Sequence, residues 1–141
     1  MFCMALFMIT IFLLVTGSPL LMVAVWDSPY LPLGNLITWA GLISFPLSIF
    51  YGTPSLRKPS GNIVKWLSAW LKAMIILSLL WFPLSALLAG NLSNSFGQSS
   101  SFQGGQTAMR LFWIYSFGVP ISTLIIWVCF GILKLVGRNK A

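Results

Sequence analysis

The chain has 141 residues, of which 58% are hydrophobic and only 6% are charged, and its formal net charge is +7. Its mean hydropathy is +0.94. Because a soluble domain carries roughly a quarter charged residues, this chain has too little polar surface to face water on all sides. The composition therefore excludes an ordinary water-soluble domain and predicts that a lipid bilayer surrounds the chain.

Four apolar segments follow one another along the chain, each near the length of about 20 residues that a helix needs to cross a bilayer. They run from Phe2 to Trp26, Leu33 to Gly52, Leu71 to Gly90 and Leu111 to Leu133. Lipid offers no partners to backbone groups, and the segments lack the alternation of a membrane β-strand, so each is predicted to be a helix. We predict an all-α polytopic membrane protein, built as an antiparallel bundle of two helical hairpins.

The prediction places one four-helix transmembrane domain over residues 1–141, with helices near 2–26, 33–52, 62–90 and 111–133. The third helix is predicted to begin in the interface at residue 62 and to enter the membrane near residue 71. The first segment has the apolar run of a secretory signal followed by small residues at 16–18. Since no Lys or Arg precedes this run, we expect it to be retained as a span.

Basic residues alternate between the connections. Residues 27–35 and 91–108 contain no Lys or Arg, whereas residues 53–65 and the C-terminal tail from residue 134 contain three each. Because basic connections stay on the cytoplasmic side, both termini are predicted to be cytoplasmic and the loops 27–35 and 91–108 outside, in a bacterial inner membrane. The thin spread of positive charge indicates lipid headgroups rather than nucleic acid as the partner.

Prolines recur inside the apolar segments. FPLS occurs at 45–48 and at 82–85, and VPIS occurs at 119–122. Each proline removes an N–H donor and frees the carbonyl four residues earlier, and serine hydroxyls, a neighbouring helix or water are the expected partners of that carbonyl. The candidate kink and packing residues are Pro19, Pro46, Pro83, Pro120, Ser48, Ser85 and Ser122. They are predicted to lie in one layer about 10–16 Å below the outer surface, either as ordinary kinks or as a hinge, pore constriction or ligand cleft.

The start of the third helix has an amphipathic pattern over residues 62–72. Lys65, Ser68 or Ala69, and Lys72 recur at nearly helical spacing, and Trp66 and Trp70 are predicted on the opposite side. Trp and Lys side chains in this pattern are typical of a membrane interface, where lysine extends its ammonium group to the headgroups. The predicted inner anchors are Arg57, Lys58, Lys65, Trp66, Trp70, Lys72, Lys134 and Arg138.

Two features are predicted on the outer side. Asp27 is the one acidic residue of the chain, and Arg110 is a basic residue on the same predicted side, so the two form a candidate ion pair. The long uncharged connection after the third helix contains Phe96 and Phe102, which are candidates to anchor it to the membrane surface or to a partner protein.

The chain offers few groups for catalysis. It contains no His and a single carboxylate, which excludes imidazole chemistry, paired-acid hydrolysis and carboxylate metal sites. Cys3 and Cys129 form no C-x-x-C motif and are predicted to pack as small apolar residues. We therefore predict no enzymatic activity, no catalytic residue, no metal and no cofactor.

Three functional hypotheses remain. The first is a non-catalytic integral subunit, or an assembly and stabilising partner, of a larger membrane protein complex. It rests on small residues suited to helix packing, namely Gly41, Ser44, Ala69, Ser78, Gly118 and Ser122. The partners would be other integral membrane subunits or further copies of this chain. The alternatives are a small oligomeric channel or transporter for anions or neutral solutes, and a membrane-embedded immunity or exclusion protein.

Overall fold

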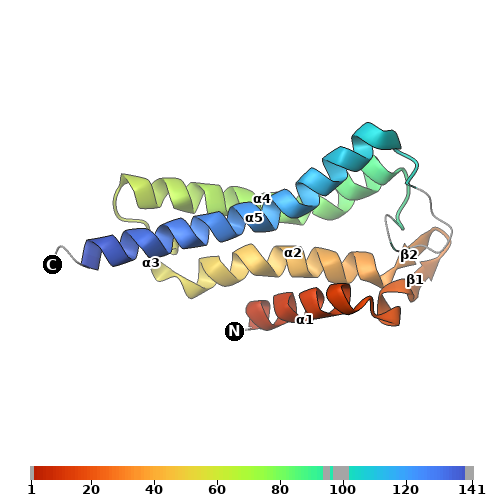
Figure 1. Cartoon of the computed structure of the whole chain (residues 1–141), viewed down its shortest axis with the longest axis horizontal. Coiled ribbons are helices and arrows are strands. Elements are labelled where there is room, and N and C mark those ends of the chain that lie inside the picture. The colour runs from red at the N-terminus through yellow and green to blue at the C-terminus, as the bar shows by residue number, and fades with distance from the viewer. Residues whose placement is uncertain (1, 94–95, 97–101, 139–141) are drawn as a thin grey trace.

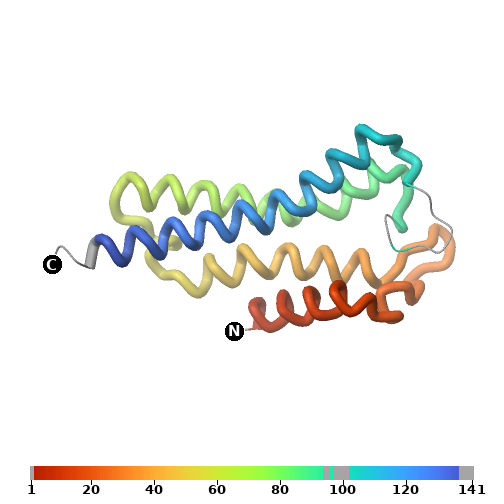
Figure 2. Tube along the Cα trace, in the orientation of Figure 1, coloured from red at the N-terminus to blue at the C-terminus, as the bar shows by residue number. Residues whose placement is uncertain are grey.

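The computed structural model describes residues 2–93, 96 and 102–138, and this part of the chain is mostly helical (Figures 1 and 2). The α-helices are α1 (Phe2–Thr16), α2 (Leu33–Gly52), α3 (Pro54–Arg57), α4 (Asn62–Ala89) and α5 (Gly105–Arg138). A 3-10 helix, η1 (Pro19–Met22), follows α1, and the strands β1 (Ala24–Asp27) and β2 (Tyr30–Pro32) precede α2.

Three helices, α2, α4 and α5, are long and apolar enough to cross a membrane, which supports an integral membrane location. The 28 residues of α4 and the 34 of α5 exceed the length that a bilayer core of about 30 Å requires. Helix α1 is apolar but has only 15 residues. At 1.5 Å per residue it reaches about 22 Å, which is less than the thickness of that core.

The predicted helix over residues 2–26 is wrong in its second half, because α1 ends at Thr16. Gly17 follows with φ +60°, a left-handed conformation that favours glycine and ends a helix. Pro19 then opens η1, where the missing N–H of proline costs nothing, and the Ser18 hydroxyl accepts a hydrogen bond from Leu20 N at 3.4 Å. Pro19 therefore starts a short helix instead of kinking a long one.

The all-α prediction also needs a correction at this point. Strands β1 and β2 pair antiparallel, with Trp26 opposite Leu31 and Asp27 opposite Tyr30. The phenolic hydroxyl of Tyr30 donates to Met22 O at 2.7 Å and ties the hairpin to η1. β-Branched and aromatic residues in this stretch favour an extended chain once η1 has ended the helical run.

Helix α2 is the central element. It packs against α1, α3, α4 and α5, whereas α1 packs along α2 and α5 packs mainly along α4 (Figure 1). The larger core cluster holds Phe45, Ile49, Leu56, Leu71, Met74 and Ile126, and the smaller one holds Leu42, Trp81 and Phe112. Helices α2, α4 and α5 each contribute to both clusters, and α2 is in addition the helix along which α1 packs.

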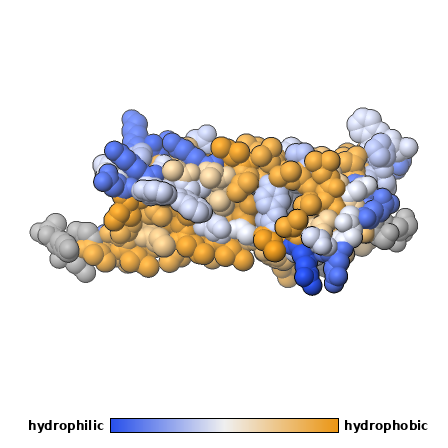
Figure 3. Space-filling view, turned by 90° about the horizontal axis from the view of Figure 1, so that it is seen from above, coloured by the Kyte–Doolittle hydropathy of each residue, from blue (hydrophilic) through white to orange (hydrophobic). Residues whose placement is uncertain are grey.

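The β-hairpin and the described ends of the α4–α5 connection lie at one end of the molecule, and α3 and the end of α5 lie at the other (Figure 1). The face in Figure 3 is apolar along the middle of its length, and hydrophilic residues gather toward the two ends. An apolar belt between polar ends is the surface expected of a protein whose middle lies in lipid.

Candidate functional site

Helices α1 and α2 approach closely at a glycine. A Cβ atom at Gly41 would overlap the side chain of Thr10, so only glycine fits at this crossing. The Thr10 hydroxyl lies within hydrogen-bond distance of Leu6 O at 3.0 Å and of Ile37 O at 3.3 Å, and the second acceptor belongs to α2. A small residue on one helix and a hydroxyl on the other are typical of helix pairs in membranes.

An indole N–H links α2 to α4 at the carbonyl that Pro83 frees. Trp39 Nε1 lies 3.1 Å from Ser78 O and 3.1 Å from Leu79 O. Leu79 is four residues before Pro83, so its carbonyl has no helical N–H donor. A neighbouring helix was one of the expected partners of a carbonyl freed by proline. At Leu79, Trp39 of α2 is that partner.

Two aromatic side chains link α4 to α5. Trp81 is 1% exposed, and its Nε1 donates to the Ser116 hydroxyl at 2.8 Å. The Tyr115 hydroxyl donates to Leu77 O of α4. These bonds satisfy polar atoms that hydrocarbon cannot satisfy, and they fix the register of the two helices.

The serines of the two FPLS motifs bind a different carbonyl from the one that was predicted. Ser48 Oγ donates to Phe45 O at 2.7 Å, and Ser85 Oγ donates to Phe82 O at 2.9 Å. Both acceptors lie three residues earlier, within reach of the hydroxyl in the same turn, whereas the carbonyls freed by the prolines lie farther back. Ser122 is half-buried beside the contact between α4 and α5.

The four prolines do not line one common cavity. Pro46 is buried, Pro83 and Pro19 are exposed, and Pro120 is half-buried and faces the space between α1 and α5. Their different faces follow from the packing of each helix, because α2 is covered on more sides than α4 or α5.

The predicted inner anchors lie at the α3 end of the molecule, as far as the structure describes them. Arg57, Lys58, Lys65, Lys72 and Lys134 are exposed, and so are Trp66 and Trp70, at 69% and 53%. Arg138 is the last residue of α5, and the position of its side chain lies outside the described part of the structure. Exposed Trp and Lys side chains near a helix end match an interfacial role, which stays a prediction.

The predicted sides of residues 62–72 need a correction. Of the two residues expected on the polar side at this turn, Ala69 is exposed, whereas Ser68 is 2% exposed and its hydroxyl donates to Leu56 O at 2.7 Å. Leu71 is also buried, while Trp66 and Trp70 share the exposed side with Lys65. Ser68 is buried because α3 packs against α4 at this point, where Leu56 O of α3 accepts the hydrogen bond of the Ser68 hydroxyl.

Asp27 and Arg110 form no ion pair, although the structure describes both residues. Each side chain is exposed. Asp27 lies on the hairpin that packs against α2, and Arg110 lies on the first turns of α5, which packs mainly against α4. The two elements have different neighbours, so the structure does not bring the two charges together.

The phenylalanines of the α4–α5 connection are half-buried against the protein itself, and their anchoring to the membrane surface or to a partner stays a prediction. The ring of Phe96 lies against Gly34, where a Cβ would overlap it, and the ring of Phe102 lies 5.7 Å from that of Phe112.

Asn35 is 0% exposed and donates to Leu92 O at 2.5 Å, while its Oδ1 has no partner among the described residues.

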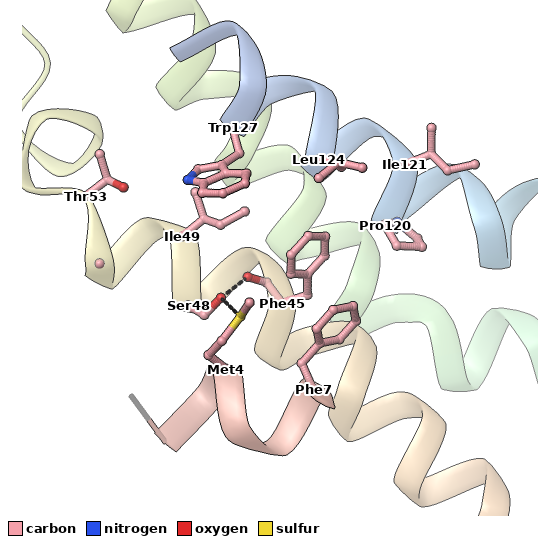
Figure 4. Close-up of a pocket in the computed structure, with 11 residues that line it drawn as sticks. Met4, Phe7, Phe45, Ser48, Ile49, Thr53, Pro120, Ile121, Leu124 and Trp127 are labelled. Carbon is pink, nitrogen blue, oxygen red and sulfur yellow. Dashed lines mark hydrogen bonds between the residues drawn. The ribbon is translucent and has the colours of Figure 1, made fainter. Parts of the chain in front are cut away.

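A groove runs between α1 and α5 over α2, and we name it the α1–α5 groove. It consists of two hollows of about 540 Å³ and 490 Å³ that share Phe7 and Pro120 as lining residues. The first hollow is lined by Met4, Phe45, Ser48, Ile49 and Trp127 among others, and Figure 4 shows these side chains. Almost all of the lining is apolar.

Sequence reasoning missed the roles of Trp39, Trp81, Tyr115, Thr10 and Asn35. A signal was present, because an indole, phenol or amide inside an apolar segment needs a partner when it is buried. The identity of that partner depends on which helices are neighbours, and the linear pattern does not contain this information.

Comparison with protein-family models, curated proteins and solved structures gives no match for this chain.

Proposed function

We propose that this chain is a non-catalytic integral membrane subunit, or an assembly partner, that binds another membrane protein through α5. The observation that supports this proposal is the open position of Gly118. A Cβ at Gly118 would meet no atom within 4 Å, in contrast to one at Gly41. Gly118 and Ser122 are four residues apart on α5 and line a hollow beside α4. Small residues at this spacing let a second helix approach closely.

The small residues of the chain fall into two groups. Gly41, Ser44 and Ser78 are buried within the protein, where they serve its own packing. Gly118 and Ser122 are not covered in this way. Helix α5 also exposes large apolar side chains along its length, including Trp113 and Phe117. Uncovered small residues flanked by apolar side chains support contact with a partner helix.

The membrane arrangement belongs to the same proposal. We take α1 as a fourth membrane-inserted helix, because it packs along α2 and exposes Phe2, Phe12 and Val15. A helix of 15 residues requires local thinning of the bilayer or a deep-lying end. Both termini are assigned to the cytoplasm of a bacterial inner membrane from the basic residues of the α3 connection and the tail.

The experiment is purification of the tagged chain in mild detergent at native abundance, with identification of the proteins that accompany it. Gly118→Leu is expected to lower the recovery of the partner at least tenfold, since a bulky side chain blocks close approach. Gly131→Leu is the matched control, because a Cβ at this glycine of the same helix also meets no atom within 4 Å. A homogeneous particle that contains only one copy of this chain would contradict the proposal.

The two alternative functions have separate tests. A channel or transporter for anions or neutral solutes would give solute flux in liposomes that contain the purified chain alone. An immunity or exclusion protein would bind one target and inhibit its activity in the membrane. No specific contact in the described residues favours either over a packing role.

A further inference from the structure

The floor of the α1–α5 groove is apolar and has no free hydrogen-bond donor. The rings of Phe7 and Phe45 stack with centroids 4.3 Å apart and planes 9° apart (Figure 4). The Ser48 hydroxyl is already engaged with Phe45 O at 2.7 Å and lies 3.8 Å from Met4 Sδ. A hollow of about 540 Å³ with this lining has the size of a ligand site and suits a hydrocarbon chain.

Polar side chains lie at one end of the groove. Figure 4 shows Trp127 and Thr53 at this end, with the indole nitrogen on the Thr53 side of its ring. Among the described residues, neither the Trp127 N–H nor the Thr53 hydroxyl has a hydrogen-bond partner, and Thr53 does not cap α3 with its side chain. An indole N–H at the end of an apolar surface is typical of the zone between hydrocarbon and headgroups.

Two cations lie on the elements that continue from this polar end toward the α3 end of the molecule. Thr53 leads directly into α3, whose last residue is the exposed Arg57. Lys134 follows Trp127 by seven residues of the same helix, which is two turns or about 10 Å along nearly the same face. The single carboxylate of the chain, Asp27, lies in the hairpin at the opposite end of the molecule. Neither cation lines the groove itself, but the end of the molecule nearest Thr53 is positively charged.

We propose that the α1–α5 groove binds one anionic phospholipid. Its acyl chain lies on Phe7 and Phe45, its glycerol and ester region meets Trp127 and Thr53, and its phosphate is attracted to Arg57 and Lys134. The cations near the polar end favour an anionic headgroup over a neutral one, and the apolar lining of the groove fits an acyl chain. The proposal is independent of the partner protein proposed above.

The test uses the full chain in detergent and counts bound lipids by native mass spectrometry. Phosphatidylglycerol and phosphatidylcholine with the same acyl chains are titrated separately. The first phosphatidylglycerol should bind several-fold more tightly than phosphatidylcholine. Arg57→Gln and Lys134→Gln should each weaken phosphatidylglycerol about fivefold and leave phosphatidylcholine unchanged, since a basic residue near anionic lipid contributes about 1 kcal/mol. Lys65→Gln removes an exposed cation of α4, a helix that contributes no residue to the hollow in Figure 4, and it should change neither affinity.

A second set of experiments distinguishes binding of the acyl chain in the groove from attraction of the phosphate to the cations. Leu124→Trp narrows the groove and should weaken both lipids, while thermal unfolding confirms that the variant is folded. Inorganic phosphate at millimolar concentration should not displace the lipid, and displacement would identify an ion site in its place. Equal binding of the two lipids by the wild type, or equal losses in Lys65→Gln and Lys134→Gln, would overturn the proposal. So would photo-crosslinking from position 127 to a protein in native membranes with no crosslink to lipid.

Discussion

The two FPLS motifs share four residues and a local hydrogen bond, yet they lie in the protein in different ways. In α2, Phe45 and Pro46 are buried and Ser48 faces the α1–α5 groove. In α4, Pro83 is exposed and Ser85 is 0% exposed. In both motifs the serine hydroxyl donates to the carbonyl of the phenylalanine. The local geometry follows the tetrapeptide, whereas the buried face follows the neighbours of the helix.

The neighbours explain the difference. Helix α2 is packed by α1, α3, α4 and α5, so most of its circumference is covered, including the side that carries Pro46. Helix α4 is packed by α2, α3 and α5, and the side that carries Pro83 faces outward. Although Pro83 is exposed, the carbonyl that it frees contacts another helix, because Trp39 of α2 lies within hydrogen-bond distance of Leu79 O.

The largest effect is expected on the covered face of α2. Gly41→Leu should lower the free energy of unfolding by about 2–3 kcal/mol, because the new side chain overlaps Thr10 and forces α1 away from α2. Gly118→Leu makes the same chemical change where a Cβ meets open space, and it should not destabilise the isolated chain. Unfolding in mixed micelles measures both. Equal losses of unfolding free energy in the two variants would show that the destabilisation does not come from the close packing around α2.

The next effect compares the serines of the two motifs directly. Ser85→Leu should cost about 1–3 kcal/mol, since it places a larger side chain at a position with 0% exposure. Ser48→Leu should cost less than about 1 kcal/mol, because its side chain faces the groove. The same unfolding assay ranks the two variants, and the reverse order would contradict the assigned faces.

A smaller effect tests the link between the motifs. Trp39→Phe removes the indole N–H and should cost about 1 kcal/mol, the usual contribution of one hydrogen bond. In a Pro83→Ala background the backbone N–H at residue 83 can bind Leu79 O again, so the same substitution should cost less. A double-mutant cycle should give a coupling energy of about 0.5 kcal/mol or more, and strict additivity would refute the link.

The smallest effect is expected at exposed charges far from both motifs. Asp27→Asn and Arg110→Gln should each change the unfolding free energy by less than about 0.5 kcal/mol. Their double variant should be additive, because the two side chains form no ion pair in the structure. A loss in the double variant that is smaller than the sum of the two single losses would show that the pair forms in the membrane.

The sequence by itself determined the membrane location and the existence of the three long helices, although α5 (Gly105–Arg138) extends beyond the predicted residues 111–133 at both ends. Those helices need only a continuous apolar run, and α2 matches the predicted residues 33–52. The end of α1 was not predicted, although Gly17 and Pro19 are recognisable breakers, because proline alone does not distinguish a kink from a new start. The sequence identified the serines and prolines of the candidate layer. It did not identify which carbonyl each serine hydroxyl binds, or which prolines are buried and which are exposed.

Only the tertiary structure decided which residues meet. The bond from Trp39 to Leu79, the overlap at Gly41 and the α1–α5 groove all join residues that are far apart in the chain. In an apolar sequence every face of a helix is similarly hydrophobic, so the pattern carries no signal for which face is covered. That choice is made by close packing and by buried polar groups that must find partners, and both depend on neighbours in space.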